Sequence, residues 1–197
     1  MHNPAINMLL SAGNCFTTAQ AVAQGISRQT LCDYCNSGKL VRMGRGVYLP
    51  VFTNNSDFPE IEVLQRKGTD FVLCLFSALK FYNIGTQNPS GIWIAIRKTQ
   101  HIPRVAFQLE CIRCEERYFH ALVSTYTLNN LPIKVYSPAK TIADCFKFRN
   151  KIGLDVAMEA LREAWQKKLF TMDELSAAAN ICRVERIITP YMEMLVG

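Results

Sequence analysis

Glycines divide the first fifty residues into short segments, and this spacing limits what that part of the chain can fold into. Gly13, Gly25 and Gly38 each follow a run whose apolar residues have helical spacing, and glycine is common just after a helix. The next stretch, 38–50, reads GKLVRMGRGVYLP and places two short apolar runs around a Gly-Arg-Gly tip, as in a two-stranded hairpin. Three short helices followed by a hairpin is the layout of a winged helix-turn-helix.

The second and third segments begin with side chains that cap helices. Thr17, with Gln20 three residues later, has the capping-box pattern, and Ala21 and Val22 are then expected to face inward. Ser27 is a favourable N-cap for the third helix. The turn between these helices, QGIS, is short and contains glycine, as a helix-turn-helix prefers. We therefore expect a winged helix-turn-helix, with a boundary at roughly residue 52.

The third helix carries a polar face that suits DNA. In a winged helix this element enters the major groove with its N-terminal residues near base edges. Arg28 suits guanine and Gln29 suits adenine, each through two hydrogen bonds. Ser27 and Thr30 can donate to phosphate, as can the amides at the helix start, and Asn36 lies on the same polar face. We expect all five side chains to belong to a DNA-binding site.

The hairpin predicts the second part of that site. Arg42 and Arg45 lie near its tip and Lys39 lies at its entrance, whereas a tip buried in a core would not carry arginine. Gly44 and Gly46 would allow a sharp turn and a close approach to a duplex. We expect the three basic side chains to contact phosphates or the minor groove.

Charge and hydropathy set the broad class. The formal net charge of +6 permits contact with a polyanion without demanding it, and residues 1–50 carry four basic side chains against one acidic side chain. The start of the chain lacks the pattern of a signal peptide, and the most apolar run, 71–79, is too short to span a bilayer. We expect a cytoplasmic protein with reduced thiols and no membrane contact.

Two CxxC pairs, Cys32/Cys35 and Cys111/Cys114, have the spacing of metal ligands. A zinc site normally joins such pairs by a short loop, whereas 75 residues intervene here. We therefore favour small apolar cysteines and expect neither a metal nor a cofactor.

The sequence offers no credible active site. Its three histidines lie in no motif, and there is no phosphate-binding glycine loop or nucleophile elbow. Glu110 lies in a predicted strand, QLECI, as a catalytic acidic residue of a nuclease could. Such a site would need a lysine two positions later, and that position is Ile112. Asp144 fits either a helix-surface charge or a buried cap for another segment, and we favour a structural role. We therefore expect a protein that is not an enzyme.

Beyond residue 50 the composition changes. Residues 51–59 are rich in Asn, Ser and Asp and predict a linker between a first domain, 1–52, and a second domain, 57–197. Within the second domain, 69–85 is apolar almost all round and predicts a buried helix. Strands are expected at 91–96, 104–112, 118–128 and 131–136, followed by helices to the C-terminus. The expected fold class is α/β (α+β), with a mostly antiparallel sheet flanked by helices in the second domain.

Two stretches resemble AbiEi-type antitoxins. Residues 16–50 look like the N-terminal winged helix of that family. Residues 134–175 look like the matching part of its C-terminal domain, with Ser137-Pro138, Thr141 and Asp144 followed by a helix containing Ala160-Leu161-Arg162.

The resemblance implies the antitoxin of a bacterial toxin–antitoxin pair in phage defence by abortive infection. Such a protein binds inverted repeats in its own promoter and represses its operon. Its C-terminal domain counteracts a nucleotidyltransferase-like toxin encoded by the neighbouring gene. Whether antitoxin and toxin touch, and whether two copies bind one repeat as a dimer, stays open at this point.

Three other functions stay open as well. One is a stand-alone winged-helix transcription regulator whose second domain senses a ligand or binds a protein, and the neighbouring reading frame distinguishes it. Another is a winged helix that binds only proteins, which would give an absent or salt-insensitive gel shift. The last is an enzyme such as a nuclease, which metal-dependent cleavage of nucleic acid would reveal.

Overall fold

The computed structural model describes residues 4–51, 58–128 and 131–196, which fall into two compact units. The first unit consists of Met1–Asp70 and His101–Gln108, and the second of Phe71–Gln100 and Leu109–Gly197. Residues 52–57, most of the expected linker, lie outside the described residues.

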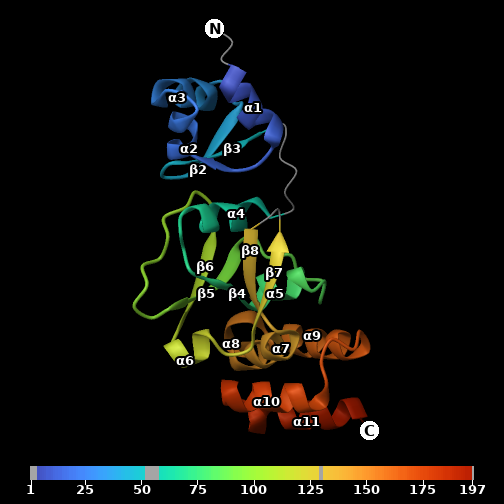
Figure 1. Ribbon diagram of the computed structural model, residues 1–197. Coiled ribbons are helices and arrows are strands. Elements are labelled where there is room, and N and C mark those ends of the chain that lie inside the picture. The colour runs from blue at the N-terminus through green and yellow to red at the C-terminus, as the bar shows by residue number, and fades with distance from the viewer. Residues whose placement is uncertain (1–3, 52–57, 129–130, 197) are drawn as a thin grey trace. The chain divides into compact units, whose positions relative to one another are not determined.

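The first unit contains the expected helices and hairpin (Figure 1). Its elements are α1 (Pro4–Ala12), β1 (Phe16–Thr17), α2 (Thr18–Ala23), α3 (Arg28–Asn36), β2 (Leu40–Gly44), β3 (Val47–Pro50) and α4 (Pro59–Arg66). The strands form an antiparallel sheet in the order β1-β3-β2. Thr17 and Gln20 form the expected capping box, and Ala21 is buried. Val22 was expected to face inward, but its side chain is 50% exposed.

Two apolar clusters hold this unit together. The first joins the three N-terminal helices to the sheet through Ile6, Phe16, Ala21, Ile26, Leu31 and Leu40. The second joins the sheet to α4 through Cys15, Val47, Leu49 and Val63, and Val105 and Phe107 pack against it. The expected strand at 104–112 was therefore wrong over its first part. Strand β6 begins at Leu109, and the alternating residues before it face the winged helix.

The second unit is a five-stranded sheet with helices. Its elements are β4 (Val72–Leu73), α5 (Leu75–Phe81), β5 (Ile92–Arg97), β6 (Leu109–Cys114), α6 (Glu116–Phe119), β7 (Val123–Leu128), β8 (Leu131–Tyr136), α7 (Pro138–Lys147), α8 (Arg149–Ile152), α9 (Leu154–Gln166), α10 (Met172–Cys182) and α11 (Glu185–Val196). The strand order is β6-β5-β4-β8-β7. The mixed α/β class is confirmed.

The sheet is mixed rather than mostly antiparallel. Strands β4 and β5, and β7 and β8, pair antiparallel, whereas β5 pairs parallel with β6 and β4 pairs parallel with β8. Consecutive strands that run parallel need a long crossover connection. The connection from β5 to β6 includes His101–Gln108, which belongs to the first unit. The sequence-based expectation took this crossover for a strand.

The apolar run at 69–85 is not one helix. Val72 and Leu73 form β4, in the middle of the sheet, and the helix α5 begins only at Leu75. A central strand is covered on both faces, so it is apolar throughout and has no periodicity that separates it from a buried helix. The stretch 118–128 is also divided, because α6 ends at Phe119 and β7 begins at Val123.

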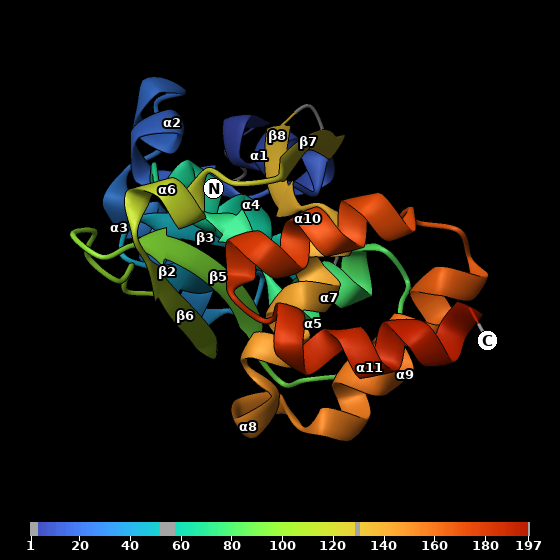
Figure 2. The same ribbon diagram turned by 90° about the horizontal axis from the view of Figure 1, so that it is seen from below.

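The C-terminal helices lie together on one side of the sheet, with α10 and α11 farthest from the strands (Figures 1 and 2). Helix α7 packs against α5, α9 and α10. The expected Ser137 cap and Pro138 start of α7 are confirmed, as is the Thr171–Glu174 capping box of α10. Pro190 was expected to kink or restart the last helix, and it lies inside α11.

Candidate nucleic-acid interface

Helix α3 is fixed at its start by its cap and along one face by the core. Ser27 has extended backbone, and its Oγ accepts a hydrogen bond from the amide of Thr30 at 3.1 Å. Leu31 is fully buried, and Tyr34 and Cys35 pack against the same cluster. Anchoring this face leaves Arg28, Gln29 and Asn36 exposed on the helix surface.

Some of the expected DNA-binding side chains already have partners. The Gln29 amide donates to Asp33 Oδ1 at 2.9 Å, and the hydroxyls of Ser27 and Thr30 lie 2.9 Å apart. To read adenine, Gln29 must therefore exchange Asp33 for a base edge. Within residues 4–51, 58–128 and 131–196, the exposed Arg28 side chain has no hydrogen bond or ion pair that it must break before it turns toward a ligand.

Two basic residues lie next to the C-terminal half of α3. The Lys39 Nζ is 5.3 Å from the ring centre of Tyr34. Arg42, on β2, is close enough to Cys35 to lower the pKa of that thiol, although burial and the neighbouring Cys32 raise the pKa above its ordinary value of 9.0. Arg28 thus lies at the start of α3, and Lys39 and Arg42 lie beside its C-terminal half.

The hairpin tip is held by contacts from within the first unit. The Gly46 carbonyl accepts from the amide of Thr18 at 2.9 Å, which ties the tip to the start of α2. The Arg45 carbonyl accepts from Lys67 Nζ at 3.5 Å, while the Arg45 side chain is exposed. The tip therefore presents Arg45 on a braced backbone.

Strand β2 is also held at its outer edge by the crossover segment. The Ala106 amide donates to the Met43 carbonyl at 3.0 Å, and Gly44 forms an antiparallel bridge with Val105. A Cβ on Gly44 would lie 3.2 Å from the Arg104 carbonyl oxygen. The expected reason for Gly44, close approach to a duplex, therefore needs correction, because its own chain makes that approach. Gly46 has a φ of +73°, so the expected sharp turn is confirmed there.

Sequence reasoning missed this support from 101–108 and from Lys67. The signal available was the alternation of Val105 and Phe107, which indicated a packed segment without indicating its partner. Lys67, at the C-cap of α4, carried no signal beyond its charge.

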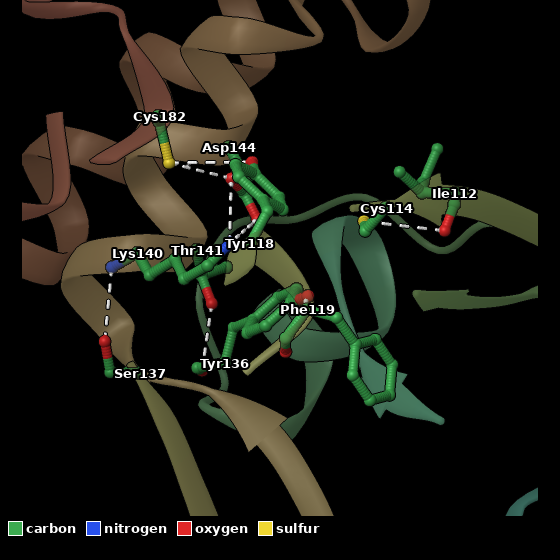
Figure 3. A network of polar contacts seen from close by, with 10 residues as sticks. All are labelled: Ile112, Cys114, Tyr118, Phe119, Tyr136, Ser137, Lys140, Thr141, Asp144 and Cys182. Atoms are coloured by element: carbon green, nitrogen blue, oxygen red, sulfur yellow. Dashed lines mark hydrogen bonds and ion pairs between the residues drawn. The ribbon is translucent and has the colours of Figure 1, made fainter. Parts of the chain in front are cut away.

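Asp144, left open between a surface charge and a buried role, lies inside the second unit (Figure 3). Its side chain is paired with Lys140, which is fully buried, at 3.0 Å. It also accepts hydrogen bonds from Tyr118 Oη and, at 3.1 Å, from Cys182 Sγ. Lys140 Nζ lies 3.7 Å and 3.6 Å from the ring centres of Tyr118 and Tyr136. Asp144 therefore forms a buried junction with residues of α6, α7 and α10. This position excludes the alternative of a charge on the helix surface.

The two CxxC pairs lie in different units, Cys32/Cys35 on α3 and Cys111/Cys114 on β6. Across residues 4–51, 58–128 and 131–196, no three His, Cys, Asp or Glu side chains are grouped to hold a metal ion. Glu110, the residue that suggested a nuclease strand, forms an ion pair with Lys151 at 3.1 Å. In the same described ranges, no helix is both long and apolar enough to cross a membrane.

A winged helix-turn-helix with an exposed, polar third helix and arginines on its wing is an arrangement that transcription regulators use to bind DNA. In agreement with this class, residues 4–51 match the family model described as "Transcriptional regulator, AbiEi antitoxin". The resemblance is thereby confirmed for the winged helix, α1 through β3. No curated protein matches the chain.

Proposed function

We propose that this chain is a DNA-binding antitoxin that represses its own operon. Arg28, Gln29 and Thr30 would read bases at the start of α3, with Ser27 holding that start and Asn36 contacting the duplex farther along. Lys39, Arg42 and Arg45 would hold the phosphate backbone.

One observation carries the DNA-binding part: the exposed polar face of α3 and the wing arginines occur together on a segment that matches a regulator family. The wing arginine side chains are exposed while the backbone at the tip is tied down, so binding has to order the side chains but not that backbone. The charge balance of the first fifty residues also favours a polyanion.

The antitoxin part rests on the family match and on the resemblance of 134–175. We place the counteraction of a nucleotidyltransferase-like toxin in the second unit, with no enzymatic step and no cofactor. Repression of its own operon would place the chain in the cytoplasm. Inverted repeats would accommodate two copies of the chain.

A two-part experiment in cells tests this function. A reporter behind the chain's own upstream DNA should be repressed by the intact protein and released by Arg28→Ala. Arg186→Ala, an exposed arginine on α11, is the matched control and should still repress. Expression of the neighbouring gene should arrest growth, and co-expression of the chain should relieve the arrest. Unchanged reporter output with the intact protein argues against repression, and a harmless neighbour argues for the stand-alone regulator.

A further inference from the structure

Helix α3 carries a pair of thiols one helical turn apart. Cys32 is exposed and Cys35 is half-buried, and both are free. Of the other cysteines, Cys111 is half-buried and the rest are buried. The one exposed cysteine among the eight therefore has a second thiol one turn away, on the helix proposed to enter DNA.

The geometry of a helix brings such a pair close to bonding distance. At 1.5 Å rise and 3.6 residues per turn, Cα atoms three residues apart lie about 5 Å from each other, inside the range found in disulfides. Their Cβ atoms lie about 5.6 Å apart, roughly 1 Å too far. Closing the bond must therefore move the helix backbone. Cys35 lies in the last turn of α3, which ends at Asn36, and terminal turns open most easily.

The other CxxC pair does not share this geometry. Cys111 and Cys114 lie on strand β6, three residues apart. Side chains at that separation in a strand point to opposite faces of the sheet, so their sulfur atoms cannot meet.

We propose that Cys32 and Cys35 form a reversible dithiol–disulfide site on α3, oxidised by a peroxide, and that oxidation weakens DNA binding. The effect on DNA rests on the function proposed above, whereas formation of the disulfide does not.

The chemistry balances with hydrogen peroxide as the oxidant. Exposed Cys32 releases its proton, and its thiolate attacks one peroxide oxygen as the O–O bond breaks. The leaving hydroxide takes up that proton, so a sulfenic acid and one water form. Cys35 then releases its proton and its sulfur attacks the Cys32 sulfur as the S–O bond breaks. The leaving hydroxide takes up that proton and departs as a second water. Two thiols lose two electrons and two protons, and the peroxide is reduced to two waters. Cys32 reacts first because it is the exposed thiol, whereas burial raises the pKa of Cys35 and lowers the fraction of its thiolate.

The disulfide would disturb the residues that we assign to DNA. The distorted turn contains Asn36 and leads into Lys39, whose ammonium lies over the Tyr34 ring. Arg42 lies near Cys35 on the adjacent strand. A strained, exposed disulfide is also easily reduced, which suits a reversible switch.

The first test is chemical and uses the full chain with hydrogen peroxide. Trypsin cleaves after Arg28 and Lys39, so one peptide, 29–39, contains both thiols. After peroxide, that peptide should lose about 2 Da and both alkylatable thiols, and dithiothreitol should restore them. In Cys35→Ser, dimedone should trap a sulfenic acid on Cys32. In Cys32→Ser, Cys35 should stay alkylatable. An unchanged peptide, or oxidation of Cys35 before Cys32, overturns the dithiol site.

The second test measures binding to the upstream DNA. Oxidised protein should bind at least about tenfold more weakly than reduced protein, a loss of roughly 1.4 kcal/mol. The variant Cys32→Ser/Cys35→Ser should bind equally with and without peroxide. If oxidation closes the disulfide and leaves DNA affinity unchanged, the switch is excluded. If reduced protein does not bind the DNA at all, the proposed function fails, and the peptide mass still decides whether the dithiol site exists.

Discussion

Lys140 Nζ lies 3.0 Å from Asp144 Oδ2, and both side chains are buried in the second unit. They stand one turn apart on α7, so the helix itself sets their register. Tyr118 and Cys182 donate to the same carboxylate, and two tyrosine rings flank the ammonium group (Figure 3). Each charge thus has polar or aromatic partners in place of water.

Removing one member of this pair should destabilise the second unit strongly. Asp144→Ala leaves the Lys140 charge buried without its carboxylate, which costs about 3–5 kcal/mol. The double variant Lys140→Met/Asp144→Leu should recover much of that loss, because no charge is left unpaired. Chemical denaturation measures the free energy of unfolding of both variants. Lys98→Ala, which breaks an ion pair with side chains 58% and 70% exposed, is the control and should change stability by less than about 1 kcal/mol. A similarly small effect of Asp144→Ala would contradict the buried junction.

Stability of the second unit should fall with rising pH through the thiols of this core. Burial, and then the Asp144 charge, raise the pKa of Cys182 from 9.0 to about 12. A raised pKa means that the folded state holds its proton while the unfolded state loses it. The stabilisation that the protonated Cys182 thiol adds to the folded state is complete below pH 9.0. It is lost as the pH rises toward about 12. Denaturation midpoints across that window should decline less steeply in Cys182→Ala. If the midpoints of both proteins declined equally with pH, the Cys182 thiol would ionise as readily in the folded state as in the unfolded state.

Arg28→Ala should reduce both affinity and base preference. A bidentate arginine–guanine contact is worth about 1–3 kcal/mol, so loss of the side chain should flatten the difference between guanine and other bases at one position. Competition binding with single-base variants of the upstream site measures this. A uniform loss across all sequences would instead place Arg28 on phosphate.

Arg45→Ala should weaken binding to every sequence alike. A phosphate contact carries no base information, and its loss should reduce the slope of log affinity against log salt by about one unit. Affinity measured over a salt series gives that slope, with Arg186→Ala as control. An unaltered slope would remove Arg45 from the interface.

Gly44→Ala should loosen the crossover segment. The added Cβ would meet the Arg104 carbonyl oxygen at 3.2 Å, and we expect a cost of about 1–3 kcal/mol as the backbones separate. Hydrogen exchange in 101–108 should rise. Gly25→Ala is the comparison, since its φ of +78° strains the backbone but its Cβ would meet nothing within 4 Å. Equal exchange in 101–108 for both variants would show that the close approach of Arg104 to Gly44 does not hold the crossover segment.

Local signals in the sequence predicted the winged helix well. Thr17, Ser27 and Thr171 cap the helices expected of them, since a cap depends on residues within four positions. The hairpin followed from Gly46, whose positive φ is required at the turn itself.

Contacts between residues far apart in the sequence could not be predicted from local signals. Nothing local indicates that Val105 pairs with Gly44, and a short buried strand such as β4 has no periodicity to separate it from a helix. The sequence favoured a structural role for Asp144 but could not name its partners, because only the fold brings Tyr118 and Cys182 to it. At the candidate interface, the sequence identified the basic residues but not the contacts that hold the wing tip.

The most direct measurement is the affinity of the pure, reduced protein for its own upstream DNA and for scrambled DNA at two salt concentrations. We predict tighter binding to the upstream DNA, with affinity for both falling as salt rises. Equal affinity for the two DNAs, or no binding at low salt, would contradict an operator-reading winged helix.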